Sequence, residues 1–267
     1  MQSDLFLHST AVNIIVILMK ALSIKNISKT FETINGPRQI LKDVSFELDE
    51  GQCLVIGGEN GSGKSIMMSI IAGLENADSG SVEIFGESEN KKNTVKKVGL
   101  VFQEAETQIL GETPAEDIAF GPKNLGWKKS EVNQAVSTAL EKTGLTEKKD
   151  FTARFLSGGE KRRLAVACML AMNLPVIILD EPYANLDYGG VKQVNTLIKD
   201  LKSQGKTVII LSHEIEKCLA LADRFIVLFR GVKVFDDVPS KILTTDVEQW
   251  NIRNPFNSYT KVEDLIW

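Results

Sequence analysis

The chain has 267 residues, of which 43% are hydrophobic and 25% charged, and its formal net charge is −4. This length suffices for one large core, or for a core with a subdomain. The slightly acidic balance argues against a chain-wide basic surface for nucleic acid, while local basic patches stay open. The three cysteines, Cys53, Cys168 and Cys218, form no Cys-x-x-Cys pair, so we expect small, buried, reduced side chains of a cytosolic protein.

The beginning of the chain carries one apolar run, "AVNIIVILM", at residues 11–19. A membrane-spanning helix needs about 20 residues, and a signal peptide needs a basic start, whereas residues 1–10 contain no Lys or Arg. We therefore predict that residues 1–18 are a dispensable extension, produced by a start assigned too early. Any role at a membrane would then require a partner.

Two kinds of strand are expected along the chain. Residues 22–31 and 40–51 alternate apolar and polar side chains, which is typical of half-exposed antiparallel strands. Continuous apolar, β-branched runs instead indicate strands covered on both faces. These runs lie at residues 53–57, 98–103, 175–182, 207–214 and 224–229. Because they alternate with helical patterns, we predict an α/β fold with a mainly parallel, three-layer sheet.

A helical region interrupts these strands between Gln103 and Met172. In "SEVNQAVSTALEKTGL", at residues 130–145, apolar side chains recur at helical spacing. This stripe comprises Val132, Val136, Ala139 and Leu140. We expect Ser130 to cap the start of this helix and Gly144 to end it.

The stretch "GGENGSGKSI", at residues 57–66, follows the pattern G-x-x-x-x-G-K-[ST] of a phosphate-binding loop. Its glycines let backbone N–H groups turn toward one anion, and the following helix adds its positive end. Lys64 would reach the β- and γ-phosphates, and the Ser65 hydroxyl would ligate Mg²⁺. The alternative is a glycine-rich turn that binds nothing, but the flanking strand and helix favour phosphate. The expected nucleotide contacts are Gly58, Asn60, Gly61, Ser62, Gly63, Lys64, Ser65 and Ile66.

A pair of acidic residues ends the buried run "VIILDEP". A hydrolase that uses a metal needs one carboxylate for the ion and another group as base. We expect Asp180 to hold Mg²⁺, through water, and Glu181 to orient and polarise the attacking water. The alternative is an acidic pair that only interacts with a helix dipole. The phosphate loop upstream favours the hydrolase interpretation.

A second anion site is expected at "LSGGE", which precedes another helix. One chain has no obvious need for two phosphate-binding sites on one nucleotide. A head-to-tail dimer does need them, if the second closes on the partner's γ-phosphate. The residues are Leu156, Ser157, Gly158, Gly159 and Glu160.

With these ordered motifs, the chain resembles the ATP-binding cassette (ABC) ATPases, whose signature is LSGGE/Q, over about residues 20 to 240. The resemblance implies a P-loop NTPase with a mainly parallel RecA-like core, an N-terminal antiparallel β subdomain and an inserted α-helical subdomain, with ATP and Mg²⁺ as ligands. The expected units are a 1–18 extension, a core at 19–102 and 172–240 that includes the β subdomain, a helical subdomain at 103–171 and a 241–267 tail.

The resemblance also implies roles for single residues. Gln103 looks like the loop glutamine that contacts Mg²⁺ and water and responds to a transmembrane partner. Asp187, in "ANLD", looks like the carboxylate that crosses the dimer interface. His213 looks like the histidine that contacts the γ-phosphate, although a histidine at a strand end can also be a core residue. Phe31 looks like the aromatic residue that stacks on adenine, although it can also belong to the core.

Two residues depart from the family pattern. Many relatives have Thr where Ile66 stands, and its hydroxyl can meet the α-phosphate. The lost hydrogen bond costs on the order of 1 kcal/mol, so binding should persist. Glu59 is uncommon at its position, and its charge would repel phosphates if it faced inward. We expect its side chain to point outward.

The segment at residues 102–127 looks like the cassettes of energy-coupling factor (ECF) and cobalt-type importers. Gln108 and "IAFGPKNLGW" match these relatives, while "EAET" replaces the common Asn-Pro-Asp. The resemblance implies a groove, which includes Gln108, for the coupling helices of a transmembrane subunit. The alternative is an ordinary amphipathic helix pair that packs on the core.

These features imply the ATP-hydrolysing subunit of an importer for a vitamin or a transition-metal ion. Its partners would be a second ATPase subunit, identical or related, a transmembrane coupling subunit and a substrate-binding membrane subunit. The chain would lie at the cytoplasmic face of the membrane, and no nucleic acid is expected.

The sequence leaves open other classes of protein that use the same phosphate-binding residues. The main alternative is a soluble ABC ATPase that acts on nucleic acid or ribosomes, and its ATPase activity would be stimulated by nucleic acid. Such proteins usually add long coiled coils or a second cassette, whereas this chain has one phosphate loop. A small-molecule kinase would need an acceptor pocket, which nothing in the sequence requires. The sequence does not name the transported substrate.

Overall fold

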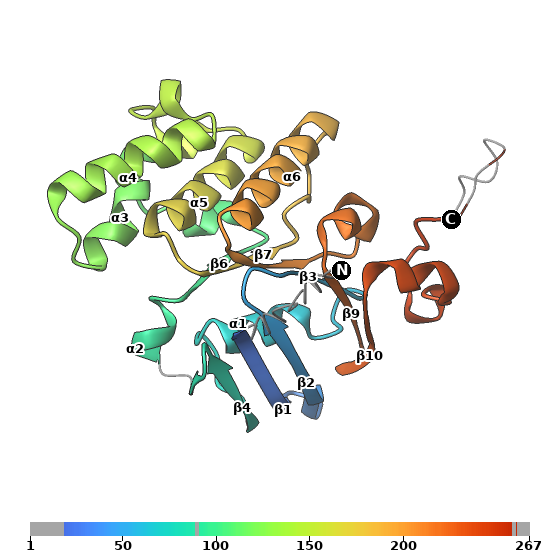
Figure 1. Cartoon of the computed structure of the whole chain (residues 1–267). Helices are drawn as coiled ribbons and strands as arrows, with labels where there is room; N and C mark the ends of the chain where they lie inside the picture. Colours follow the sequence, from blue (N-terminus) through green and yellow to red (C-terminus); the bar gives the residue numbers. More distant parts are fainter. Residues whose placement is uncertain (1–18, 89–90, 258–259, 261–267) are drawn as a thin grey trace, which may run out of the picture.

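The computed structural model describes residues 19–88, 91–257 and 260, and it contains two β-sheets (Figure 1). The predicted extension at residues 1–18 lies outside this range. The smaller sheet has the strand order β2-β1-β4-β5, and the larger has the order β10-β9-β3-β8-β7-β6. The α/β fold expected from the sequence, with a small antiparallel sheet beside a mainly parallel core, is confirmed.

The small sheet is built on a long hairpin. β1 (Lys20–Thr33) pairs antiparallel with β2 (Gly36–Asp49), and its other edge pairs with β4 (Ser79–Ile84), which pairs in turn with β5 (Glu87–Ser88). In β2 the alternate side chains of Val44, Phe46 and Leu48 are buried, which explains the period-two pattern there, whereas residues 21–24 of β1 are all buried. β4 and β5 are not among the strands expected from the sequence.

The large sheet holds the continuous apolar runs. β6 (Val98–Val101), β7 (Val176–Asp180), β8 (Thr207–Leu211), β3 (Cys53–Gly57) and β9 (Arg224–Phe229) are parallel neighbours in that order. All residues of β3, β6, β7 and β8 are buried, as strands covered on both faces require. β10 (Val232–Asp237) adds an antiparallel edge strand that the sequence analysis did not identify.

The helices cover both faces of the large sheet (Figure 1). α1 (Lys64–Ile71) lies between the two sheets, and its Met67, Met68 and Ile71 join the core that the sheets share. α5 (Gly158–Met172) and α6 (Tyr188–Ser203) contribute to a second core on the opposite face.

The predicted helical region comprises α3 (Pro114–Asn124), α4 (Lys129–Lys142) and α5, which enclose a third apolar core. The remaining helical segments are short. They are α2 (Lys91–Thr94), η1 (Ala105–Gln108), η2 (Thr146–Lys148), η3 (Ala153–Phe155), η4 (Ile215–Lys217), η5 (Leu219–Leu221), η6 (Pro239–Thr244) and η7 (Glu248–Trp250).

One helix boundary was predicted wrongly. Ser130 is not the cap of α4, because the helix already begins at Lys129 and the Glu131 carboxylate accepts the backbone N–H of Lys128 at 2.7 Å. The predicted end is confirmed, since α4 ends at Lys142 and Gly144 follows with φ +64°.

The C-terminal segment packs on its own chain as far as the structure describes it. Ile242, Val247 and Ile252 are buried in the second core, and the Trp250 ring lies 6.0 Å from that of Phe235 on β10. Among the described residues, no helix is long and apolar enough to cross a membrane. The three cysteines are free, with Cys53 and Cys218 buried and Cys168 half-buried.

Candidate nucleotide site

The phosphate loop connects β3 to α1 at the carboxyl end of the parallel strands. Gly58 has φ +149°, and a Cβ there would lie 2.2 Å from the Leu228 carbonyl oxygen. Gly63 has φ +103°, and a Cβ there would lie 2.7 Å from Leu41. These two glycines are therefore required by the chain's own packing, while Gly61, with φ +81° and open space around it, is required by its backbone conformation.

Lys64 lies inside the loop, with only 5% of its surface exposed. Its Nζ donates to the carbonyl oxygens of Gly58 at 2.6 Å and Glu59 at 3.0 Å. Burial lowers the pKa of Lys64, while the charges of Glu181, Asp180 and Glu59 act in the opposite direction. The ammonium group is thus held in the concave side of the loop, where a phosphate would meet it.

A hollow of about 240 Å³ opens beside the loop. It brings together nine residues that the sequence predicts for this site and two from β2. Its lining is Arg38, Ile40, Asn60, Gly61, Gly63, Lys64, Ser65, Ile66, Gln103, Asp180 and Glu181. Phe31 does not line it. Phe31 lies on β1 opposite Arg38 and is half-buried. The Lys29 Nζ lies 5.0 Å from the centre of its ring. Its contact with adenine stays a prediction.

Asp180 and Ser65 provide oxygen atoms that suit Mg²⁺. Asp180 is 7% exposed, and its Oδ1 has no hydrogen-bond partner. Burial raises the pKa of Asp180, and a hydrogen bond with Ser65 opposes this rise. An unpartnered buried carboxylate oxygen next to a hydroxyl group is what a hard divalent cation requires, so these residues fit the ion.

Glu181 and His213 meet at the ends of β7 and β8. The His213 Nδ1 lies 2.9 Å from Glu181 Oε1, and the His213 backbone N–H donates to the same oxygen at 3.1 Å. The Ser212 hydroxyl donates to Glu181 Oε2 at 3.3 Å. Glu181 itself has φ +47°, a conformation that costs a non-glycine residue on the order of 1 kcal/mol or more. The carboxylate is thus fixed in place, while the His213 side chain stays about half exposed at 47%.

The two glutamines that follow β6 have different surroundings. Gln103 is exposed and lines the hollow, and its carbonyl oxygen accepts a hydrogen bond from Arg162 at 2.8 Å. Gln108 uses its side chain to close the turn, because its Oε1 accepts from the Phe102 N–H and its Nε2 donates to the Leu100 carbonyl. Gln108 also lines an apolar groove beside α3 and α5.

The signature residues lie at the start of α5, and none of them lines the hollow. Ser157 caps this helix by accepting the Glu160 N–H at 3.3 Å, and Ser157 and Gly158 are exposed. A Cβ on Gly158 would meet nothing within 4 Å. Leu156 is buried and anchors the segment in the helical core. Asp187 is also exposed, and its carboxylate caps α6 by accepting the Gly190 N–H at 2.7 Å.

Two residues that the sequence analysis did not single out support the site. Ser212 holds Glu181, as described above, and Asn251 holds the phosphate loop by donating from Nδ2 to Glu59 Oε2 at 2.7 Å. Glu59 is therefore directed to the C-terminal segment, and it does not line the hollow. No local pattern marks Asn251, because 192 positions separate it from Glu59.

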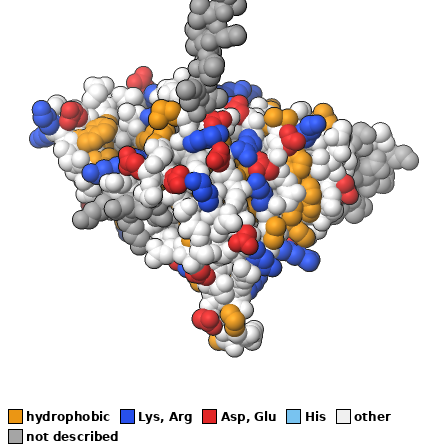
Figure 2. Space-filling model, turned by 60° about the horizontal axis from the view of Figure 1, so that its bottom comes forward, with side chains coloured by type: hydrophobic (Ala, Val, Ile, Leu, Met, Phe, Trp, Pro, Cys, Tyr) orange, Lys and Arg blue, Asp and Glu red, His pale blue; other side chains and the backbone are white. Residues whose placement is uncertain are grey.

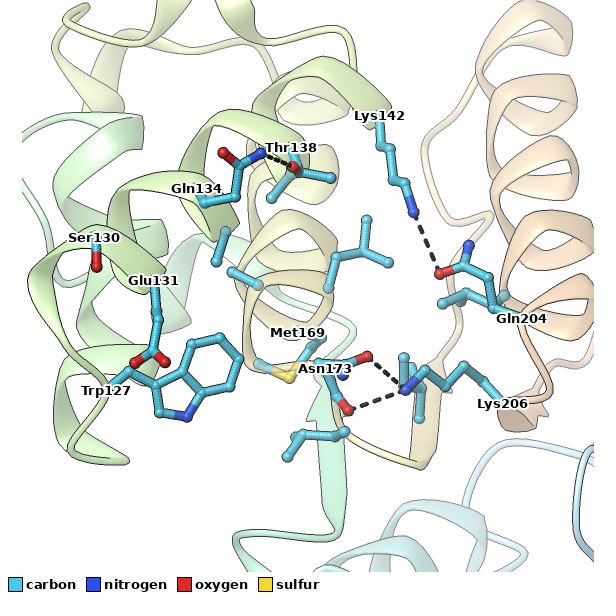
Figure 3. Close-up of a pocket in the computed structure, with 17 residues that line it drawn as sticks. Trp127, Ser130, Glu131, Gln134, Thr138, Lys142, Met169, Asn173, Gln204 and Lys206 are labelled. Carbon is cyan, nitrogen blue, oxygen red and sulfur yellow. Dashed lines mark hydrogen bonds between the residues drawn. The ribbon is translucent and has the colours of Figure 1, made fainter.

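A larger groove of about 530 Å³ lies away from these residues, between α4, α5 and α6 (Figure 3). Lys142 of α4 reaches Gln204 across it, and Lys206 binds the backbone and side-chain oxygens of Asn173. None of the predicted site residues lines this groove. On the face shown in Figure 2, basic and acidic side chains are interspersed and form no single basic stripe.

The fold and the phosphate loop define a P-loop nucleotide-binding ATPase. Comparison with known proteins gives the family: the ABC transporter family matches residues 41–184, and the chain belongs to it. The chain is accordingly an ATPase that binds ATP.

Curated relatives extend this match. An energy-coupling factor transporter ATP-binding protein, EcfA1, of Ligilactobacillus salivarius is 40% identical over 235 residues, which are 86% of this chain and 82% of the relative. A putative ABC transporter ATP-binding protein of Pyrococcus furiosus is 36% identical over 222 residues, which are 82% of this chain and 85% of the relative.

Solved structures agree with the fold. The cbiO1 protein of Clostridium perfringens, described as part of the ABC transporter complex cbiONQ, superposes with a TM-score of 0.76 at 27% identity, over 89% of this chain and 96% of the other. The dimeric cassette MJ0796, in a post-hydrolysis state with ADP and Pi, gives a TM-score of 0.75 at 28% identity, over 82% and 98%.

Proposed function

We propose that the chain is the ATP-hydrolysing subunit of an importer of the energy-coupling factor type, which moves a vitamin or a transition-metal ion through separate membrane subunits. The observation that carries this proposal is the apolar groove lined by Gln108, on the segment that begins with Gln103 at the nucleotide hollow. The similarity to ATP-binding proteins of energy-coupling factor transporters supports it. The alternative of a soluble ABC ATPase acting on nucleic acid finds no support among these relatives.

The groove has a volume of about 430 Å³ and lies between α3, α5 and the segment after β6. On its rim, Val95, Leu110 and Phe120 expose 52%, 68% and 49% of their surfaces. Large apolar side chains gathered around a groove are typical of a site that receives an amphipathic helix. The buried Asp117 fixes one wall, because its Oδ1 accepts the N–H groups of Leu110 and Gly111.

The nucleotide chemistry follows from the arrangement of the chain's own residues. Lys64 and the loop amides would bind the β- and γ-phosphates, while Glu181 would orient the attacking water and accept its proton. His213 holds the Glu181 carboxylate and would contact the γ-phosphate. Asp180 and Ser65, with Gln103, would hold Mg²⁺, which when bound neutralises charge on the phosphate oxygens.

A second ATPase subunit would complete each nucleotide site. We propose a head-to-tail dimer in which residues 156–160 of one chain close on the nucleotide of the other, with Asp187 at the interface. The subdomain boundaries expected from the sequence, with the helical subdomain at 103–171, are part of this proposal. The chain would lie on the cytoplasmic face of the membrane, held there through its membrane subunits.

The experiment is co-purification from membranes with the tagged full chain, followed by identification of the bound subunits. Phe120→Glu places a charge on the groove rim and should remove the membrane subunits while the isolated chain keeps its ATPase activity. Leu243→Glu is the matched control, since Leu243 is a similarly exposed apolar residue, at 60%, in η6. Unchanged recovery with Phe120→Glu, or nucleic acid as the only co-purifying partner, would contradict the proposal.

A further inference from the structure

Arg162 is a buried cation in the first turns of α5, just behind the signature residues. Only 8% of its surface is exposed. Its guanidinium donates to three main-chain carbonyl oxygens. Nη1 binds those of Pro182, at 3.3 Å, and Ala184, and Nη2 binds that of Gln103, at 2.8 Å.

These carbonyls belong to two loops that carry predicted site residues. Gln103 is the first exposed residue after β6, and it lines the nucleotide hollow. Pro182 and Ala184 directly follow Glu181 after β7. One side chain therefore joins three segments of the chain, which are the helix behind the signature, the Gln103 loop and the loop that follows Glu181.

The chemistry of the contact favours arginine. A planar guanidinium presents several donors in a fixed fork and can serve three carbonyls at once, whereas a lysine ammonium is a single point on a flexible stem. Burial lowers the pKa of Arg162, and the charge of Glu181 acts in the opposite direction. An apolar residue here would leave the three carbonyl groups without this partner.

The Glu181 loop needs such support. Glu181 and Asn185, on either side of the bonded carbonyls, have φ of +47° and +58°. Conformations of this kind persist only where the surrounding structure fixes them. On the other side, Gln103 begins a segment that leads through η1 to the apolar groove, so a displacement there would reach Arg162 directly.

We propose that Arg162 is a positioning residue for ATP hydrolysis, which holds the Gln103 loop and the Glu181 loop in one arrangement and makes the position of Glu181 depend on that of Gln103. The proposal extends the ATPase activity and requires no membrane subunit. Its failure is therefore distinguishable from failure of the proposed importer function.

The test compares Arg162→Lys and Arg162→Gln with Arg224→Lys in the purified full chain. Arg224 is a matched control, because it also binds a backbone carbonyl, that of Glu47, and joins the two sheets. It lies at the opposite end of the sheet, since it pairs with Leu54 near the start of β3. The measurements are kcat, KM for ATP, affinity for a fluorescent ATP analogue, thermal midpoint and amide hydrogen exchange.

For both Arg162 variants we expect kcat to fall about tenfold to a hundredfold, because a small displacement of a reacting group has effects of this size. KM and analogue affinity should stay within about twofold, since the phosphate loop is untouched. Amide exchange should accelerate at residues 103–108 and 182–187. Arg224→Lys should lower the thermal midpoint without these changes.

Two results would overturn the proposal. One is that both Arg162 variants, like Arg224→Lys, lower the thermal midpoint while kcat per folded molecule stays at the wild-type value. The other is that KM rises while kcat is unchanged. Because Lys keeps the charge but not the planar fork, a loss of kcat with Lys as large as the loss with Gln would further support positioning by the guanidinium.

Discussion

At the scale of single residues, the chemistry depends on how Glu181 is held. Its carboxylate receives the His213 N–H and the Ser212 hydroxyl, and its backbone N–H donates to the Leu211 carbonyl at 3.0 Å. These contacts fix the two oxygens beside the hollow that contains Lys64. A base that is already oriented needs little rearrangement when the γ-phosphate and its water arrive.

Glu181→Gln should keep ATP binding, nearly stop hydrolysis and trap an ATP-bound dimer. The amide has the size of the carboxylate and leaves the phosphate loop intact, but it cannot accept the proton of the attacking water. Nucleotide affinity, steady-state turnover and size-exclusion chromatography with ATP measure the three effects. Turnover at the wild-type rate would refute the assignment of Glu181 as the base.

At the scale of elements, the sequence predicted those helices, strands and loops that are specified by neighbouring residues in the chain. β3, the phosphate loop and α1 follow one another directly, so "CLVIG" and "GGENGSGKSI" were enough to place them. β4 and β10 were missed because each becomes a strand by pairing with a neighbouring strand, and their patterns, "SGSVEI" and "VKVFDD", are only weakly apolar. The contacts of Arg162 were missed for a related reason, since main-chain carbonyls leave no pattern in the sequence.

The β9–β10 edge gives a prediction about stability. Asp236 on β10 binds Arg224 through both carboxylate oxygens, at 2.6 and 2.8 Å, and Lys233 at 2.5 Å. Burial alone would raise the pKa of Asp236, but the hydrogen bonds from Arg224 and Lys233 lower it below its usual value. Because the pKa is lower in the folded state than in the unfolded chain, the ionised carboxylate stabilises the fold at pH values above the pKa of the unfolded chain.

Asp236→Asn should therefore lower the free energy of unfolding by roughly 2 kcal/mol at pH 7. The deficit should shrink as the pH falls below about 4, where the wild-type carboxyl begins to take up a proton, first in the unfolded chain. Urea unfolding at several pH values measures it. Asp150→Asn, at a side chain that is 78% exposed, is the control and should change little. A pH-independent deficit would contradict the ionic origin.

At the scale of the whole molecule, the phosphate loop and the signature are two separate parts of one chain. Lys64 lines a hollow whose lining contains no signature residue, while Ser157 and Gly158 are exposed at the start of α5. The capped helix end at Ser157 offers N–H groups toward the outside of the chain. This separation is what a head-to-tail dimer requires, because each site then takes its loop from one chain and its signature from the other.

Mixing two inactive variants tests this shared arrangement. Lys64→Ala removes the phosphate-binding lysine, and Gly158→Asp places a negative charge where the partner's γ-phosphate would lie. The second change should not disturb the fold, because a Cβ at Gly158 meets nothing within 4 Å. Each variant alone should have little ATPase activity. A mixed dimer of the two has one site in which both the loop and the signature are intact.

An equal mixture should regain roughly a quarter of wild-type activity, if copies pair at random and sites act independently, because half of the dimers are mixed and each has one intact site. The control is a chain that carries both substitutions. Mixed with either single variant, it forms no dimer in which one site has both an intact loop and an intact signature. Pull-down of an untagged copy by a tagged one shows that copies exchange. The contradicting result is a mixture that stays inactive although the copies exchange and the wild type is active. In that case the phosphate loop and the signature do not form a shared site between copies of this chain.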